Sequence, residues 1–442
     1  MEKRDVVVYS EDYKKLVDAA ALKDKYYEID ERVEEICKEA FKGCDKLEEI
    51  VMPKKLKKID SEAFQGCSSL TKLTLPDSVM SIGKGAFRGC SGLTELTLPN
   101  SVARIDGLAF CGCSGLTELT LPNSVKSIGD GAFADCSGLE KITVESGNSR
   151  YDSRDNCNSI IDKKTNTLIV GCKNSIIPNS VTRIGDSAFE YCSGLTELTL
   201  PNSVASIGDS AFYVCRGLEK ITVESGNSCY DSRDNCNSII DKKTNTLIVG
   251  CKNSIIPNSV TSIGSGAFAY CSGLTELTLP NSVTSIGYAA FRGCSGLTEL
   301  TLPNSITSIG DYAFADCSGL SKITSLAEIP PVCDSEVFDG VNKTNCELIV
   351  PIMSVTAYKQ AEVWNEFSNI SGLSGVEDTV ADGNTIRAIG NQIEISGDFT
   401  SVEVYGINGA LIYKGKDNVV TVPSAGIYLV HVAGKTRKIV VE

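Results

Sequence analysis

Hydrophobic and polar residues recur along most of this chain in a unit of about 23 residues, each marked by an Ala-Phe pair. Successive marker phenylalanines are separated by either 23 or 56 residues, and 56 is one unit plus 33: Phe41, Phe64, Phe87, Phe110, Phe133, Phe189, Phe212, Phe268, Phe291 and Phe314. A fixed short period of this kind predicts a solenoid, in which each unit forms one coil and neighbouring coils bury each other's apolar side chains.

The unit SGLTELTLPNSVTSIGYAAFRGC (272–294) shows what each part of a coil contributes. Its segment LTELTL predicts a strand with three inward leucines, Leu274, Leu277 and Leu279. Pro280 ends that strand because it cannot donate to a ladder. Val283 and Ile286 begin the opposite, convex side of the coil, and Phe291 lies on a short helical turn that faces the core.

Ten of the 19 cysteines occupy one position of the unit: Cys44, Cys67, Cys90, Cys113, Cys136, Cys192, Cys215, Cys271, Cys294 and Cys317. We expect them to form an inward column of small apolar thiols. A metal site needs ligands that converge on one point, whereas a column spreads them along a line. We therefore expect no metal and no cofactor.

Composition excludes several classes of function. The 442 residues carry a net charge of −14, which disfavours nucleic acid and anionic membrane surfaces as partners. No apolar run reaches the roughly 20 residues that span a bilayer. The single histidine, His431, lies in the strand-like segment GIYLVHVAG, so catalysis by a histidine base is disfavoured and we predict no catalytic residues.

The pattern LxxLxLPxxVxxIGxxAFxxC, repeated with the same Ala-Phe-x-x-Cys punctuation, resembles the BspA-like leucine-rich repeats over residues 34–372. The resemblance implies a right-handed leucine-rich-repeat solenoid with strands on its concave face. It also implies a surface or secreted protein of a host-associated bacterium, since some members of the family are adhesins for host matrix proteins.

Two nearly identical inserts, at about 145–177 and 224–256, interrupt the repeats, and Cys229 replaces Arg150 in the second. Each contains NSIIDKKTNTLIVG, which predicts a β-hairpin turning at Lys164-Thr165 and at Lys243-Thr244. Two cysteine pairs flank these turns and are either free or disulfide-bonded: Cys157 with Cys172, and Cys236 with Cys251. The acidic stretch YDSRDN favours turn capping over a calcium site because it lacks the EF-hand spacing.

Different sequences precede and follow the repeats. Residues 1–33 predict a helical cap, with Ser10 as the N-cap of a helix whose apolar face carries Leu16, Val17 and Ala20. Residues 330–372 predict a C-terminal cap in which Trp364 belongs to the core rather than to an exposed sugar-stacking platform.

Residues 376–442 predict a small all-β sandwich that follows a Gly-Ser stretch around 371–375. Six short alternating segments predict its strands: QIEIS, SVEVYGI, ALIYKG, VVTVP, GIYLVHV and RKIVVE. Asn408-Gly409 predicts a hairpin turn. The pattern VEVYGINGALIYKG…PSAGIYLVHVAGKTRKIVV resembles the C-terminal sorting domain of Bacteroidetes type IX secretion substrates. That resemblance implies an extracellular or outer-surface location, with a removed leader explaining why MEKRDVVVYS has no signal-peptide character.

The concave face is expected to carry a mixed Lys/Glu column and a threonine column. Its candidate binding residues are Glu95, Thr97, Glu118, Thr120, Glu197, Thr199, Glu276, Thr278, Glu299 and Thr301. Such a surface serves recognition in many solenoids, although strand propensity and solubility alone also explain it. We expect a monomeric, non-enzymatic adhesin that binds a host or bacterial surface protein or glycan. The alternatives are a glycan-binding or scaffold protein and, least favoured, a carboxylate-pair hydrolase.

Overall fold

The fold comes from a computed structural model that describes residues 7–373, 378–379, 385–389, 391–397, 399–407, 409–432 and 435–441. The chain forms two compact units. The first comprises residues 1–321 and 331–343, and the second comprises residues 322–330 and 344–442.

Short Ser-Ile strands form one side of each coil in the first unit, and they pair in parallel from coil to coil into three sheets. The first sheet contains β1 (Val8–Tyr9), β2 (Lys15–Asp18), β4 (Glu35–Ile36), β6 (Lys58–Ile59), β8 (Ser81–Ile82), β10 (Arg104–Ile105) and β12 (Ser127–Ile128), with β1 antiparallel to β2. The second contains β14 (Tyr151–Asp152), β15 (Ile160–Asp162), β16 (Thr167–Val170), β17 (Arg183–Ile184) and β19 (Ser206–Ile207). The third contains β21 (Tyr230–Asp231), β22 (Ile239–Asp241), β23 (Thr246–Val249), β24 (Ser262–Ile263), β25 (Ser285–Ile286), β27 (Ser308–Ile309) and β29 (Val332–Cys333).

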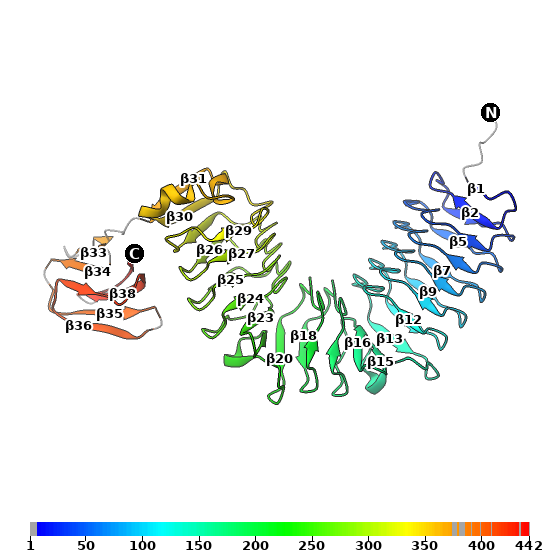
Figure 1. The fold of residues 1–442 in the computed structure, drawn as a ribbon, viewed down its shortest axis with the longest axis horizontal. Coiled ribbons are helices and arrows are strands. Elements are labelled where there is room, and N and C mark those ends of the chain that lie inside the picture. The colour runs from blue at the N-terminus through cyan, green and yellow to red at the C-terminus, as the bar shows by residue number, and fades with distance from the viewer. Residues whose placement is uncertain are drawn as a thin grey trace. The chain divides into compact units, whose positions relative to one another are not determined.

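The other side of each coil carries the segment LTELTL or its equivalent, and we call its strands the leucine strands. In the first unit they are β3 (Tyr26–Glu28), β5 (Glu49–Val51), β7 (Lys72–Thr74), β9 (Glu95–Thr97), β11 (Glu118–Leu121), β13 (Lys141–Val144), β18 (Glu197–Leu200), β20 (Lys220–Val223) and β26 (Glu299–Leu302). They pair in parallel as β3-β5, β7-β9, β11-β13 and β18-β20. Figure 1 shows the leucine strands β5, β7, β9 and β13 in this order along the solenoid, as the period predicts.

Phenylalanine rings stack through the interior along the predicted column. Phe41 and Phe64 lie 4.8 Å apart and nearly parallel, and Phe64 and Phe87 lie 5.1 Å apart at 3°. The stack breaks at each insert, where a glycine takes the place of the phenylalanine. The ring of Phe189 occupies the space that a side chain at position 171 would need, because a Cβ on Gly171 would collide with it. The insert coil therefore requires glycine at this position.

The ten predicted thiols are all buried, which confirms the interior column. Eight of the ten thiols donate to a carbonyl of the preceding coil; for example, the Cys90 Sγ donates to the Phe64 carbonyl at 3.2 Å, and the Cys113 Sγ donates to that of Phe87 at 3.3 Å. No disulfide joins any of the described cysteines, so the disulfide alternative in the inserts is wrong. Cys172 is buried in the same core as the column and interacts electrostatically with Cys192. Cys251 interacts electrostatically with Cys271 in the same manner. Both therefore belong to the column rather than to the hairpin.

The predicted N-terminal helix is absent from the described residues, and its segment forms β2 instead. Leu16 pairs with Ile36 in the Ser-Ile sheet, and Leu16 and Ala19 are buried while Val17 and Ala20 face solvent. Pairing with the next coil overrides the local helix propensity, because a strand at this place covers the open end of the sheet. The solenoid thus begins well before residue 34.

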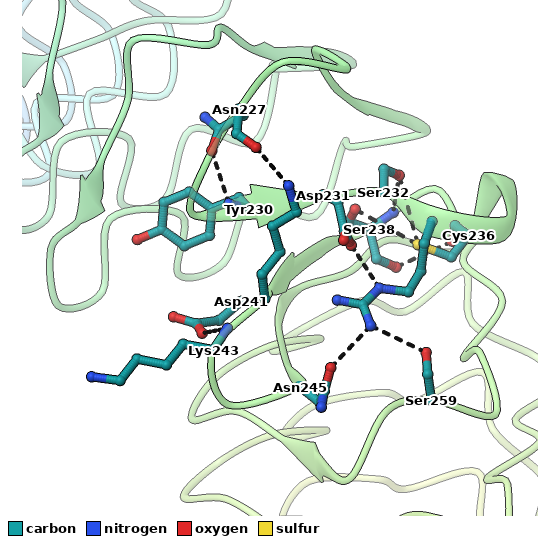
Figure 2. Close-up of polar contacts among 12 residues, drawn as sticks. Asn227, Tyr230, Asp231, Ser232, Cys236, Ser238, Asp241, Lys243, Asn245 and Ser259 are labelled. Atoms are coloured by element: carbon teal, nitrogen blue, oxygen red, sulfur yellow. Dashed lines mark hydrogen bonds and ion pairs between the residues drawn. The ribbon is translucent and has the colours of Figure 1, made fainter.

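Each insert is a β-hairpin joined to the solenoid, as predicted. Strands β15 and β16 are antiparallel around a turn at 163–166, and β22 and β23 repeat this around 242–245. A 3-10 turn precedes each hairpin: η1 (Arg154–Asn156) and η2 (Arg233–Asn235). The Asn227 Nδ2 donates to the carbonyls of Pro201 and Val204 in the preceding coil, and its Oδ1 accepts from the Tyr230 amide at 2.8 Å (Figure 2). The buried Asn227 amide therefore helps to anchor the insert, together with Asn237, which donates to the Glu219 carbonyl.

The second unit begins with a cap of parallel strands, β28 (Lys322–Ser325), β30 (Glu347–Pro351) and β31 (Asn369–Leu373), together with η3 (Ile352–Ser354), α1 (Val355–Tyr358) and η4 (Trp364–Glu366). Trp364 is fully buried and packs edge-on against Tyr358 at 5.3 Å, which confirms its core role. No helix among the described residues is long and apolar enough to cross a membrane.

The C-terminal module of this unit has two antiparallel sheets. One contains β32 (Asp378–Thr379), β33 (Thr385–Ile389), β34 (Gln392–Ser396) and β37 (Val419–Thr421), and the other contains β36 (Leu411–Gly415), β35 (Val402–Gly406), β38 (Gly426–Val432) and β39 (Lys435–Val441). Both contribute to one apolar core, which confirms the predicted sandwich and its six strands and adds β32 and β33. The predicted turn residue Asn408 and residues 374–375 of the Gly-Ser stretch lie outside the described residues.

Phe87→Ala should lower the free energy of unfolding by about 3–5 kcal/mol, because it removes a ring stacked on both sides and leaves a cavity. Urea denaturation followed by circular dichroism measures this change. Met80→Ala is the control because Met80 lies in the same coil but is 56% exposed. Similar denaturation midpoints for the two variants would contradict the stacked interior.

The free energy of unfolding should also fall at alkaline pH, because the thiols of the column are buried in the folded protein. Burial raises the pKa of Cys90 to about 12 and that of Cys113 well above its ordinary value of 9.0. The folded thiols therefore stay protonated while those of the unfolded chain ionise, so this contribution is complete below pH 9 and is lost as the pH rises towards 12. We therefore compare the double variant Cys90→Ala, Cys113→Ala with the parent protein. Between about pH 8 and pH 10, the urea midpoint of the double variant should fall less than that of the parent. Equal falls would count against protonated buried thiols.

Candidate functional site

The exposed side of the leucine strands, which we call the leucine-strand face, carries all ten candidate binding residues. Within each coil an outward Glu and an outward Thr flank an inward leucine, so the strand period alone sets their direction. All ten side chains are exposed: Glu95, Thr97, Glu118, Thr120, Glu197, Thr199, Glu276, Thr278, Glu299 and Thr301.

Strand register places like positions of neighbouring coils side by side. Thr74 pairs with Thr97, and Thr120 pairs with Thr143. Further along the solenoid, Thr199 pairs with Thr222, and an isolated bridge joins Thr278 to Thr301. The threonine column is therefore real, but it is divided: β9 and β11 belong to different sheets, so Thr97 and Thr120 are not joined in one ladder.

Most charges in the neighbouring column neutralise one another across coils. Lys72 Nζ lies 3.0 Å from Glu95 Oε2, and Lys141 lies 3.5 Å from Glu118. Lys220 and Glu197 form a third pair at 3.6 Å. Exposed pairs of this kind add little stability, so their main effect is to leave this part of the face nearly neutral.

Glu276 departs from this pattern. It stands in the coil whose Thr278 bridges to Thr301, so its neighbour in the column is Glu299, another carboxylate. The leucine segment of this coil, residues 272–279, forms no regular strand beyond that single bridge. The face therefore gains negative charge at this place, which the uniform repeat pattern of the sequence conceals.

Two exposed apolar residues of the leucine-strand face were not predicted from the sequence. Ile176 and Ile255 each stand two residues before a proline, as the column threonines do, and they are 68% and 67% exposed. Each insert thus replaces one polar member of the threonine column with an exposed isoleucine. Aligning the segment NSIIPNSV with LTLPNSV would have shown this substitution.

The acidic stretch of each insert is held by arginine, and its role in turn capping stays a prediction. Arg154 Nε donates to Asp152 at 2.8 Å, and Arg233 repeats this contact with Asp231, as Figure 2 shows. In the part of the chain that the structure describes, no group of three or more His, Cys, Asp or Glu side chains is arranged to hold a metal ion. His431 lies on β38, and its Nδ1 is 2.8 Å from the Thr436 hydroxyl.

Comparison with known families identifies the repeat. Residues 34–161, 159–250 and 238–356 match the family described as the BspA type leucine rich repeat region, in six copies. The chain belongs to this family. The BspA-type repeats thus cover the leucine-strand face and both inserts, as the sequence resemblance implied.

Several solved structures are similar to this BspA-type chain. A leucine rich cell surface protein from Faecalibacterium prausnitzii is 28% identical, with a TM-score of 0.45 over 73% of this chain and 86% of that one. The pneumococcal vaccine antigen PcpA is 22% identical, with a TM-score of 0.42 over 79% and 77% of the two chains. A leucine-rich repeat protein from Bacteroides ovatus is 25% identical, with a TM-score of 0.37 over 83% and 98%. No curated protein sequence matches the chain.

The two inserts offer a matched pair of variants. In the first, Arg150 contacts the buried carboxylate of Asp162 at 2.7 Å, and in the second Cys229 stands at the equivalent place beside Asp241. Cys229→Arg should therefore raise the free energy of unfolding by about 0.2–1 kcal/mol. Arg150→Cys should lower it by about 1–3 kcal/mol, because a buried carboxylate loses its partner. Urea denaturation measures both changes, and shifts of the same sign would disprove the pairing.

Proposed function

We propose that this chain is a non-enzymatic binding protein of the cell surface or of the secreted fraction. In this proposal it acts as an adhesin that recognises host or microbial surface macromolecules through its solenoid. The observation that carries the proposal is the leucine-strand face, where ten exposed Glu and Thr side chains recur at the same two repeat positions, most of them on strands that pair from coil to coil. A regular exposed ladder suits a macromolecular ligand because it offers many equivalent contacts over a long distance.

The paired charges favour recognition of an extended surface over capture of a small charged molecule. Lys141 and Glu118 already satisfy each other, so a ligand gains most from the threonine hydroxyls and from the exposed Ile176 and Ile255. Polar groups beside isolated apolar side chains are typical of protein recognition surfaces, where specificity comes from hydrogen bonds and affinity from apolar contacts.

The C-terminal module is proposed to direct export. Its support is the likeness of residues 390–442 to the type IX sorting domain, together with a two-sheet core in this unit, formed by residues such as Ile393, Val404 and Val430. An extracellular, monomeric protein follows from this proposal.

Reversal of three carboxylates tests the proposed face. In the triple variant Glu95→Lys, Glu118→Lys, Glu276→Lys, binding to a panel of immobilised extracellular-matrix glycoproteins should fall at least about tenfold. The reversals at Glu95 and Glu118 place like charges across coils, and all three change the charge that the face presents to the ligand. Biolayer interferometry with the full chain measures the affinity.

A charge swap separates recognition from folding. In Glu118→Lys, Lys141→Glu the cross-coil ion pair is restored with opposite polarity, so the fold keeps the contact that the single reversal breaks. Reduced binding by the swap variant, with an unchanged melting temperature, supports recognition by the face. Undiminished binding by the triple variant would remove this face as the binding site.

A further inference from the structure

The insert coils lack the loop that ordinary coils project along one edge of the solenoid. In an ordinary coil seven residues separate the Ser-Ile strand from the column cysteine, as between Ile207 and Cys215. In the second insert coil three residues separate Leu247, which pairs with Ile263, from Cys251. Gly250 stands where the Ala-Phe loop would be.

Because the insert coil has no loop here, the loops of the coils on its two sides meet directly. At the first insert the Asp135 amide donates to the Glu190 carbonyl at 3.1 Å. At the second insert the ring of Tyr213 lies over the backbone of Gly266, so closely that a Cβ there would be 2.8 Å from Tyr213 Cδ2. Each insert therefore creates a junction between loops that are 56 residues apart in the sequence.

The second junction lies within a cluster of aromatic side chains that we call the tyrosine edge: Tyr191, Tyr213, Tyr270, Tyr288, Tyr312 and Arg292. Tyr191 packs edge-on against Tyr213 with ring centres 6.1 Å apart, and Tyr288 packs in the same way against Tyr312 at 5.8 Å. The Arg292 guanidinium lies 5.8 Å from the ring centre of Tyr270 and 5.3 Å from that of Tyr312. Arg292 thus joins Tyr270 to the Tyr288–Tyr312 pair, and it also interacts electrostatically with Tyr213.

The tyrosine edge remains accessible to a partner. Tyr288 is 50% exposed and Tyr191 is 36% exposed, while Tyr213, Tyr270 and Tyr312 are half-buried. Tyrosine and arginine are the residues most often found at the energetic centres of protein interfaces, because they offer large, stiff contact areas together with polar ends. Five tyrosines and one arginine in contact fit that description.

The charge around the tyrosine edge is negative. Asp135 and Glu190 act electrostatically on Tyr191, and Glu336 and Asp311 act on Tyr312. Of the nearby cations, Arg292 is held by Asp316 at 3.2 Å, and Arg216 lies near Asp135. Carboxylates therefore outnumber the cations, and a positively charged partner is attracted both by them and by the faces of the rings.

The internal duplication singles out this edge. Residues 113–191 and 192–270 are aligned copies that differ at ten positions, and six of these lie in the edge loops: 131, 134, 135, 186, 187 and 190, numbered in the first copy; a seventh, 137, directly follows the column cysteine. The exposed Glu118 and Thr120 are unchanged as Glu197 and Thr199. The sequence differences between the copies are therefore concentrated at the edge and are not spread over exposed positions in general. One of these differences places Tyr213 where the first copy has Ala134.

We propose that the tyrosine edge is a docking site for a lysine- or arginine-bearing segment of a partner protein. This inference rests on the proposed binding function and assigns it a second surface, separate from the leucine-strand face. A protein segment fits better than a glycan, because the edge-on tyrosine pairs, inclined at 85° and 79°, do not form the flat platform on which a sugar ring stacks. Lysine and arginine side chains reach into such corners and pair with the carboxylates around them.

The test uses the full chain and a defined peptide. A labelled 12-residue peptide alternating lysine with serine is titrated at physiological ionic strength and followed by fluorescence anisotropy, with its fully Nε-acetylated form as the uncharged comparison. The lysine peptide should bind, and the acetylated peptide should bind at least about fivefold more weakly. The double variant Tyr213→Ala, Tyr288→Ser should weaken binding of the lysine peptide by a similar factor, and Tyr288→Phe should retain it because the ring remains.

Two controls test whether a loss of peptide binding comes from the tyrosine edge itself. Alanine at 213 is the residue that the first copy carries at Ala134, so the scaffold accepts it, and melting temperatures verify folding. Glu11→Gln, Glu31→Gln removes two exposed charges that belong neither to the tyrosine edge nor to the ten candidate binding residues, and it should leave peptide binding within about twofold of the parent. This control distinguishes attraction by the overall negative charge from binding at the tyrosine edge.

The proposal is overturned if the tyrosine variant binds the lysine peptide as the parent does, or if the acetylated peptide binds equally well. It is also overturned if a glycan array detects binding that the tyrosine variant loses, which would make the edge a sugar site. Loss of glycoprotein binding on carboxylate reversal together with an inert tyrosine edge would leave the proposed function standing and remove this inference alone.

Discussion

The structure depends on the hydrogen bonds that tie each coil to the next at equivalent positions. The Phe87 amide donates to the Ala109 carbonyl at 2.7 Å, and the Ser-Ile and leucine strands pair in the same coil-to-coil register. These bonds fix the separation of neighbouring coils, so any side chain at a given repeat position must lie against its own copy. Only residues that tolerate self-contact fill the interior, which explains flat phenylalanine stacks and a column of small thiols.

Departures from this constraint occur where the repeat is interrupted. The inserts replace a phenylalanine by Gly171 or Gly250, remove an edge loop and add a hairpin, and they keep the column continuous through Cys172 and Cys251. Buried amides make new connections: Asn148 and Asn227 each donate to two carbonyls of the preceding coil. The insert is thus built into the stack at the cost of breaks in the sheets and in the aromatic column.

Periodicity made most of the fold predictable. Repeat position alone identified the inward leucines, the Phe stack, the ten-thiol column, and the direction of Glu118 and Thr120, while alternation and turn residues identified the hairpins and the C-terminal sandwich. Prediction from periodicity failed where contacts between residues far apart in the sequence determine the secondary structure or the packing. Leu16 forms a strand because Ile36 lies beside it, and Cys172 joins the thiol column because its coil is short. No local pattern contains either fact.

For the candidate site, the sequence located the leucine-strand face but could not reveal that Lys72 and Glu95 neutralise each other, since this needs the distance between coils. The tyrosine edge was invisible for a related reason. Its members occupy different repeat positions, and Tyr213 and Gly266 meet only because the coil between them lacks a loop.

The 79-residue duplication has a consequence for how such a gene can change in length. The copies begin and end at equivalent places in a coil, so recombination that deletes or adds one copy joins surfaces that already fit. Every interior contact then has a counterpart, so the solenoid changes in length while each new coil still finds a matching neighbour. Each added copy also carries one more junction, on which edge residues are free to diversify independently of the interior.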